Sequence, residues 1–150
     1  MKFILTKELG RLAKWLRILG FDTVYFKEEN KGRLLIEALR ENRIILTRNQ
    51  KISRESGPKI INIKAENLKE QLRQVLEELH IEFNKDRMFR RCVICNIELD
   101  FIEKDKIKGR VPEYVFQTQK DFYICKGCGR IYWQGTHWGN VEKILQEIAQ

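Results

Sequence analysis

The sequence lacks, or has few of, several features that mark particular classes of protein, and each absence argues against one of these classes. It contains only two prolines, and it lacks any run of roughly 18 apolar residues of the kind that forms a transmembrane helix. Its beginning does not resemble a signal peptide, because Lys7 and Glu8 interrupt the first apolar run early. Internal repeats and low-complexity tracts are also missing. We therefore expect a cytoplasmic protein that does not bind membranes.

Cysteine is missing from most of the chain and then appears as two C-x-x-C pairs, Cys92 with Cys95 and Cys125 with Cys128. In a cytoplasmic chain, two close pairs indicate a metal site before disulfides. Zn²⁺ prefers four thiolate or imidazole ligands in a tetrahedron, and each pair presents two thiolates on one tight turn. Four cysteines fill all the ligand positions, so we predict a structural zinc site. Free buried cysteines and two disulfides are the alternatives.

Acidic residues are outnumbered by basic ones, 21 against 29, which gives a formal net charge of +8 and a sequence pI near 9.4. This balance favours polyanionic partners such as RNA or a ribonucleoprotein over acidic small molecules. The hydrophobic fraction of 43% is sufficient for a buried core. At 150 residues, the chain fits one domain or two small ones.

The first 22 residues read as a strand, a short turn and a helix. Residues 2–5 are apolar enough for a strand, and leucines at helical spacing follow from Leu9 to Leu19, where Gly20 ends the helix. The change from strand to helix falls at Thr6, Lys7 and Glu8. Open α/β sheets place ligands at the carboxyl ends of their strands, so Thr6 stands at a candidate site.

The next segments repeat this alternation of strands and helices. We expect strands over residues 23–26, 44–46 and 59–63, with helices ending near residue 42, over residues 49–55 and after a cap at Asn67. This order predicts an α/β fold, in which helices flank both faces of a parallel sheet of about four strands. We place a domain boundary near residue 85, giving an α/β domain over residues 1–84 and a zinc-ribbon domain with a C-terminal helix over residues 85–150. Residues 101–120 form an insertion between the two cysteine pairs.

Several segments together resemble the Mut-seven C-terminal RNase family, whose members are small PIN-like nucleases with an appended zinc ribbon. The similar segments are LGRLAKWLRILGFDTVY, RIILTRN, the two cysteine pairs, RVP and GRIYWQGTHW. The resemblance covers nearly the whole chain. It implies a PIN-like α/β fold and cleavage of RNA that depends on Mg²⁺ or Mn²⁺ bound by carboxylates at the strand ends.

The chain departs from this family at the acidic positions. Thr6 and Asn49 stand where members generally carry Asp, and Glu28 and Glu29 alone represent the acidic loop before the second helix. Neutral oxygen donors hold a dication more weakly than carboxylates do. Glu8 and Asp22 are further acids that could compensate if they converge with these residues, although the turn directs the Glu8 side chain away from Thr6 as often as toward it. The candidate catalytic residues are Thr6, Asp22, Glu28, Glu29 and Asn49. The two glutamates could equally belong to a solvated loop.

Basic side chains supply candidate RNA contacts. Arg11, Lys14 and Arg17 form a stripe along the first helix that is either a phosphate track or a solvated face. Arg48 directly follows a buried strand, where it could hold a phosphate with two hydrogen bonds. In the ribbon, Lys126 and Arg130 are candidate backbone contacts, and Trp138 is a candidate for stacking on unpaired bases.

Two functions therefore stay open. The chain is either an RNA-directed ribonuclease with a partly lost acidic site or a non-catalytic RNA- or ribonucleoprotein-binding protein that uses the same basic surface. The family resemblance favours the first, and Thr6 and Asn49 favour the second. A third reading, a protein-interaction module that docks through the ribbon, has less support from the charge.

Overall fold

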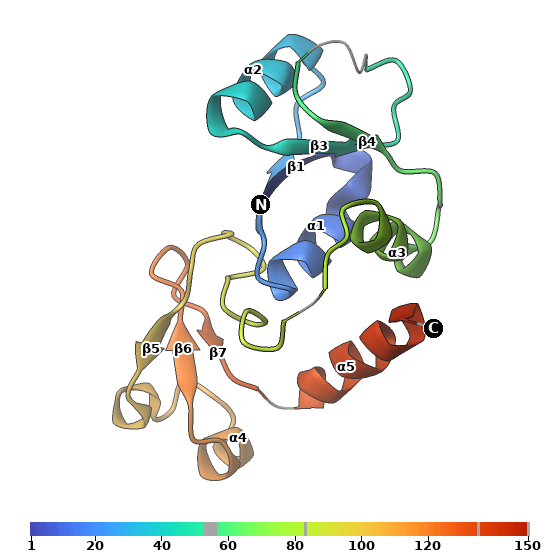
Figure 1. The fold of residues 1–150 in the computed structure, drawn as a ribbon. Helices are drawn as coiled ribbons and strands as arrows, with labels where there is room; N and C mark the ends of the chain where they lie inside the picture. The colour runs from blue at the N-terminus through green and yellow to red at the C-terminus, as the bar shows by residue number, and fades with distance from the viewer. Residues whose placement is uncertain (53–56, 83, 135, 150) are drawn as a thin grey trace.

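We describe the protein from a computed structural model. It covers residues 1–52, 57–82, 84–134 and 136–149, and for residues 136–140 and 149 it describes the backbone alone. The fold is arranged as a small parallel sheet with helices on both faces, beside a second, antiparallel sheet (Figure 1).

The first sheet has four strands, β1 (Lys2–Thr6), β2 (Asp22–Phe26), β3 (Ile44–Thr47) and β4 (Ile60–Asn62). Their order is β2-β1-β3-β4, and all three neighbouring pairs are parallel. Ile45 and Leu46 in β3 are fully buried, as expected for a strand that is covered on both faces. The predicted four-stranded parallel α/β sheet is confirmed.

Helices cover the two faces of this sheet unequally. The helices α1 (Gly10–Ile18), which follows the short 3-10 helix η1 (Lys7–Leu9), and α3 (Leu68–Glu78) lie on one face, and α2 (Lys31–Glu41) lies on the other (Figure 1). The larger core forms on the α1 and α3 side, and a smaller one forms under α2. Asn67 caps α3 as predicted, because its side-chain oxygen accepts a hydrogen bond from the backbone N–H of Glu70 at 2.9 Å.

The connection between β3 and β4 differs from the prediction. A short helix was expected over residues 49–55, but residues 49–52 form a turn, and residues 53–56 lie outside the described part of the chain. Asn49 starts this turn, since its side-chain oxygen accepts a hydrogen bond from the backbone N–H of Lys51 at 3.0 Å. A side chain that satisfies the backbone in this way favours a turn over a helix.

The second sheet contains β5 (Asp100–Ile102), β6 (Phe122–Ile124) and β7 (Ile131–Tyr132), paired antiparallel in that order. We call residues 90–134, which include this sheet and the cysteine turns, the cysteine ribbon. The insertion between the cysteine pairs adds the 3-10 helix η3 (Lys104–Ile107) and the helix α4 (Glu113–Thr118). These elements close a separate small core around Ile107, Val115 and Phe122.

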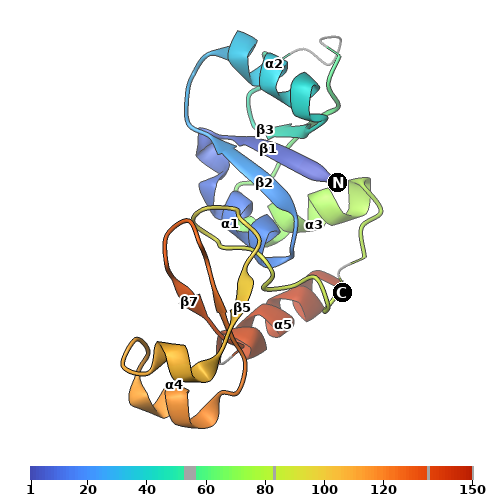
Figure 2. The ribbon, with the colours of Figure 1, turned by 90° about the vertical axis from the view of Figure 1, so that its left-hand side faces the viewer.

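The last helix, α5 (Thr136–Ala149), follows the ribbon but packs back against α3. Its side chains Val141, Leu145 and Ile148 join the larger core of the parallel sheet. Figure 2 shows α5 below α1 and α3, on their side away from the sheet. The division of the chain near residue 85 stays a prediction, because a helix from the second segment completes the core of the first. Among the described residues, none of the helices combines the length and apolar character needed to cross a membrane.

Candidate functional site

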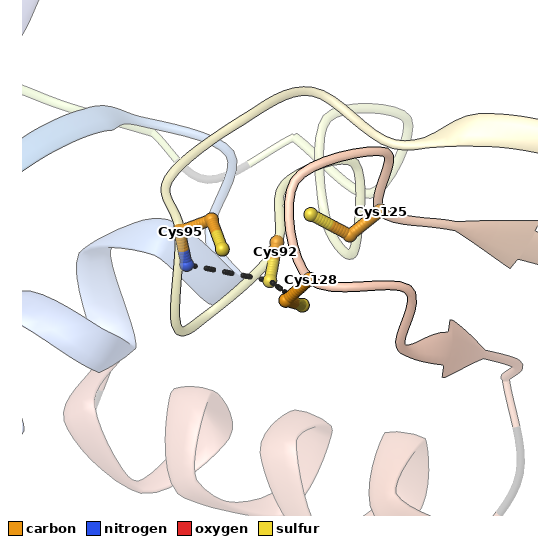
Figure 3. Close-up of side chains that lie close together, drawn as sticks. All are labelled: Cys92, Cys95, Cys125 and Cys128. Carbon is orange, nitrogen blue, oxygen red and sulfur yellow. Dashed lines mark hydrogen bonds between the residues drawn. The ribbon is translucent and has the colours of Figure 1, made fainter.

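The two C-x-x-C turns come together in the cysteine ribbon. The sulfur atoms of Cys92, Cys95, Cys125 and Cys128 all lie within 4.8 Å of one another, and all four side chains point into the same space between the turns (Figure 3). The Sγ atoms of Cys92 and Cys128 are 3.7 Å apart. A zinc tetrahedron with Zn–S bonds of about 2.3 Å requires sulfur separations of about 3.8 Å. The cluster could therefore hold a zinc ion.

Hydrogen bonds favour the thiolate form of Cys92. Burial alone would raise the pKa of this thiol, but the Tyr132 hydroxyl at 3.0 Å and the backbone N–H of Cys95 at 3.4 Å lower the pKa to about 7. Metal ions bind thiolates and not thiols, so these hydrogen bonds favour metal binding by Cys92.

Side chains of the parallel-sheet region and of the cysteine ribbon hold the first cysteine turn against the parallel sheet. Arg17 in α1 donates hydrogen bonds to the backbone oxygens of Val93 at 2.8 Å and Ile94 at 3.2 Å. The Asn96 side chain accepts from the backbone N–H of Thr23 and donates to the Asp22 carboxylate at 2.7 Å. The turn that supplies two cysteines is thus held on α1 and β2.

At the carboxyl ends of β1 and β3, Glu8 gathers a hydrogen-bond network. One oxygen of its carboxylate accepts from the Thr6 hydroxyl at 2.5 Å, from the Thr47 hydroxyl at 3.4 Å and from the backbone N–H of Arg48 at 2.9 Å. Burial would raise the pKa of Glu8, but these hydrogen bonds outweigh it and lower the pKa below the ordinary value. The corner between the two strand ends thus contains an ionised carboxylate, one oxygen of which is already engaged in three hydrogen bonds.

A hollow of about 270 Å³ opens beside this corner, lined in part by Thr6, Glu8, Glu28, Glu29 and Asn49. The structure therefore brings four of the five candidate catalytic residues together. Two of them are already paired, because Glu28 forms an ion pair with Arg33 at 3.0 Å and Glu29 forms a close ion pair with Lys7.

Asp22 lies elsewhere. It is opposite Lys2 at the amino end of β1, whereas Thr6 is at the carboxyl end of the same strand. Its carboxylate accepts a hydrogen bond from Arg43 at 2.8 Å and another from Asn96. The structure does not bring Asp22 to the strand-end hollow.

A second, larger depression of about 520 Å³ runs between α1, the end of β2 and the first cysteine turn. We call it the basic groove. Its charged lining residues in the described part of the chain are all cationic: Arg11, Lys14, Arg17 and Lys27. Val93 and Ile94 close the groove on the ribbon side, and Tyr25 lies on the sheet side with Lys27 Nζ 5.8 Å from its ring centroid. The predicted stripe of Arg11 and Lys14 is thus one wall of a groove.

The other candidate RNA contacts are spread over the surface. Arg48 is exposed, and its backbone N–H binds Glu8. Lys126 is exposed and lies 3.5 Å from the Asp100 carboxylate, and Arg130 is exposed in the ribbon. Trp138 belongs to α5, and its side chain lies outside the described part of the structure.

Sequence reasoning did not assign a role at the site to Thr47 or Lys27, and it left the direction of the Glu8 side chain open. Thr47 carried a usable signal, because it ends a buried strand next to Asn49 and so must stand beside Thr6 at the same edge of a parallel sheet. Lys27 carried none, since its place in the groove depends on how the ribbon docks.

The parallel sheet, the polar groups at its strand ends and the ribbon with four clustered cysteines define an α/β protein with an appended candidate metal site. The family model described as the Mut7-C RNAse domain matches residues 1–145. The chain therefore belongs to that family, which confirms the resemblance found in the sequence and indicates a ribonuclease-like or RNA-related function. Searches of curated proteins and of solved structures returned no match.

Proposed function

We propose that this protein binds RNA in the basic groove. The observation that carries this proposal is the lining of the groove, in which Arg11, Lys14, Arg17 and Lys27 face one depression without an acidic neighbour among its described lining residues. Cations that neutralise phosphates release counterions, and this release supplies most sequence-independent affinity for nucleic acids. Arg17 is also engaged with the ribbon, so Arg11, Lys14 and Lys27 are the side chains best placed for phosphates.

We infer that this binding is not accompanied by cleavage, because the residues of the strand-end hollow do not suit a catalytic metal ion. Mg²⁺ and Mn²⁺ require hard oxygen ligands, usually carboxylates, and Mg²⁺ gives up its water molecules reluctantly. Glu8 is the carboxylate directed into the corner, and one of its oxygens already accepts three hydrogen bonds. The neighbouring donors are neutral, and Glu28 and Glu29 are paired with cations. This set of donors does not fit a tightly held Mg²⁺ or Mn²⁺ ion.

Metal-dependent hydrolysis of RNA is the second candidate function. Family membership favours it, and so does the presence of three glutamates, Glu8, Glu28 and Glu29, around one hollow. A weak site that uses these acids in place of the missing aspartates would cleave RNA slowly.

We further propose that the cysteine cluster binds one structural zinc ion through Cys92, Cys95, Cys125 and Cys128. Four thiolates complete the tetrahedron, which leaves no position for a substrate. The role of the ion would be to fold the ribbon and to hold one wall of the basic groove, since Val93 and Ile94 lie between the two ligands of the first pair.

Binding is tested with a labelled single-stranded RNA of twelve nucleotides, measured by fluorescence anisotropy across a salt series. The Arg11→Gln/Lys14→Gln variant should bind about tenfold more weakly than the wild type at low salt. The slope of the logarithm of its binding constant against the logarithm of the salt concentration should be about 1.4 less negative, because each lost phosphate contact on a single strand contributes about 0.7.

The matched control is Arg40→Gln/Lys59→Gln, which removes the same charge from exposed positions away from the groove. It should bind nearly as well as the wild type. Equal losses in the two variants, or a wild type that does not bind RNA at low salt, would refute the proposed groove.

Cleavage is followed on the same RNA in Mn²⁺, with a Thr6→Asp/Asn49→Asp variant beside the wild type. We expect the wild type to leave the RNA intact and the variant, which restores two carboxylates at the strand ends, to gain cleavage. Cleavage by the wild type that is lost in Glu8→Gln would instead establish the hydrolytic alternative.

A further inference from the structure

The sheet of the cysteine ribbon places three aromatic residues side by side. In its antiparallel register, Phe101 of β5 lies opposite Tyr123 of β6, and Tyr123 lies opposite Tyr132 of β7. Directly opposed residues point to the same face of a sheet. We call Phe101, Tyr123 and Tyr132 the aromatic row.

The two faces of this sheet have different environments. On the other face, Ile102, Phe122 and Ile131 pack into the small ribbon core, and Phe122 is fully buried. On the face of the aromatic row, Phe101 is 61% exposed and Tyr123 is partly buried. These two rings lie outside the ribbon core, and they leave apolar surface open to solvent, most of it on Phe101.

The rings of the row are held in place by their neighbours. The centroids of Phe101 and Tyr123 are 6.1 Å apart, and their planes meet at 78°, which is an edge-to-face contact. The Tyr132 hydroxyl lies 3.0 Å from Cys92 Sγ, so this end of the row is anchored at the cysteine cluster. A preorganised ring loses little entropy when a planar ligand stacks on it.

Positive charge lies beside the row. The backbone oxygen of Arg90 accepts a hydrogen bond from the N–H of Leu99 at 2.8 Å, and Leu99 directly precedes β5, so the backbone of Arg90 lies beside the start of the strand that contains Phe101. Arg90 also lines a small hollow of about 110 Å³ next to Tyr123 and Tyr132, together with Lys85 and the acidic Asp86. Lys85 is paired with Glu142 at 3.1 Å, whereas the Arg90 side chain donates to the backbone oxygen of Asp86 and forms no ion pair within the part of the chain that the structure describes.

We propose that the aromatic row is a second RNA-binding surface, on which unpaired bases of a single strand stack on Phe101 and Tyr123 while Arg90 contacts a phosphate. Aromatic rings on a sheet with a cation nearby suit bases that are splayed out of a helix, and they do not suit a duplex, whose bases are covered. This inference rests on the proposed RNA binding and specifies its substrate: RNA with single-stranded segments.

The test compares Phe101→Ala with Tyr114→Ala in binding to two labelled RNAs, a twelve-nucleotide single strand and a duplex of the same length. Tyr114 is the matched control, because it is also an aromatic residue of the ribbon and is 71% exposed. Phe101→Ala should weaken binding to the single strand by about 5- to 150-fold, which is the range expected for loss of one stacked base. Binding to the duplex should be unchanged, and Tyr114→Ala should bind both RNAs like the wild type.

Two further measurements separate stacking from charge. The factor lost in Phe101→Ala should be the same at low and moderate salt, since stacking does not release counterions, and Phe101→Trp should restore binding. Single-strand binding that survives Phe101→Ala, or that falls equally in Tyr114→Ala, would overturn the aromatic row while leaving the basic groove intact. A wild type that binds neither RNA would instead overturn the groove and the row together.

Discussion

Asp22 and Arg43 illustrate how single residues stabilise the amino end of the sheet. The Arg43 side chain is only 5% exposed, and it donates to the Asp22 carboxylate at 2.8 Å and to the backbone oxygen of Phe3 at 3.1 Å. The Asp22 side chain is 24% exposed. Loss of the Asp22 carboxylate would leave the charge of this deeply buried guanidinium unpaired. Because the protein interior solvates charge poorly, the free energy of unfolding would fall.

We predict that Asp22→Asn lowers the free energy of unfolding by about 2 kcal/mol at neutral pH, the amount typical of a hydrogen bond to a charged group. Burial would raise the pKa of Asp22, but the hydrogen bonds from Arg43 and Asn96 bring it below its ordinary value. A carboxyl with a lowered pKa stabilises the fold above its ordinary pKa, and this contribution is lost as the pH falls through the pKa of the folded state.

Urea unfolding of wild type and variant from pH 7 downward measures this effect. The difference between the two proteins should shrink as the pH falls below about 4, where the carboxyl of the unfolded chain becomes protonated, and it should be lost once the pH is below the pKa of the folded state. Glu41→Gln is the control, because Glu41 also pairs with Arg43, at 3.3 Å, but is 40% exposed, and it should cost less than about 1 kcal/mol. A difference that stays constant in acid would contradict the assignment.

Residue roles could be predicted from the sequence only where neighbours in the chain determine them. The cap at Asn67 follows from its position before a helix. The inward direction of Glu8 depends on hydroxyls from two strands that are 41 residues apart, Thr6 and Thr47. Asp22 directly precedes the strand predicted over residues 23–26, so the sequence already placed it at the amino end of that strand, and grouping it with the acids at the carboxyl ends overlooked this signal.

At the scale of elements, α5 is the helix that the sequence analysis grouped with the ribbon and whose side chains pack in the core of the parallel sheet. Leu145 is 1% exposed in the core that it shares with α1 and α3. A buried leucine reduced to alanine loses its transfer free energy and leaves a cavity.

We therefore predict that Leu145→Ala destabilises the whole α/β unit by about 2–5 kcal/mol. Unfolding by urea, followed by far-ultraviolet circular dichroism, measures the change. Gln146→Ala is the control, because residue 146 is exposed on the same helix and alanine favours helices, so its unfolding midpoint should hardly move. Equal stability of the Leu145 variant and the wild type would mean that α5 is not part of the core.

Elements of the parallel sheet could be predicted because their signals are local. Continuous apolar runs mark the buried strands, and leucines at helical spacing mark α1 and α3. The docking of α5 could not be predicted, since an amphipathic pattern shows that a helix buries one face but not which unit covers that face. The turn after β3 was missed because Asn49 satisfies the backbone there through its side chain.

At the scale of the whole molecule, the cysteine cluster connects the ribbon to the rest. Arg17 and Asn96 bind the first cysteine turn to α1 and β2, and that turn forms one wall of the basic groove. A change in the conformation of this turn would therefore alter both the ribbon and its contact with the parallel sheet.

We predict one zinc ion per chain by elemental analysis, and a lowered thermal midpoint after the ion is removed with a chelator, because structural zinc sites contribute folding free energy. Cys128→Ser should lose the zinc. Lys126→Ser, a substitution in the same turn at an exposed residue, should keep it. A metal-free protein with an unchanged midpoint would contradict a structural zinc ion.

The return of α5 to the parallel sheet also constrains how the chain folds during its synthesis. The residues Val141, Leu145 and Ile148, which complete the larger core, are made after the entire ribbon. Until the ribosome has added them, the apolar side chains of α1 and α3 that α5 covers remain open to water and to other nascent chains. The ribbon is therefore synthesised before the core of the parallel sheet is complete. A ribosome that stalls within residues 90–134 would leave that core with exposed apolar side chains, which favour aggregation.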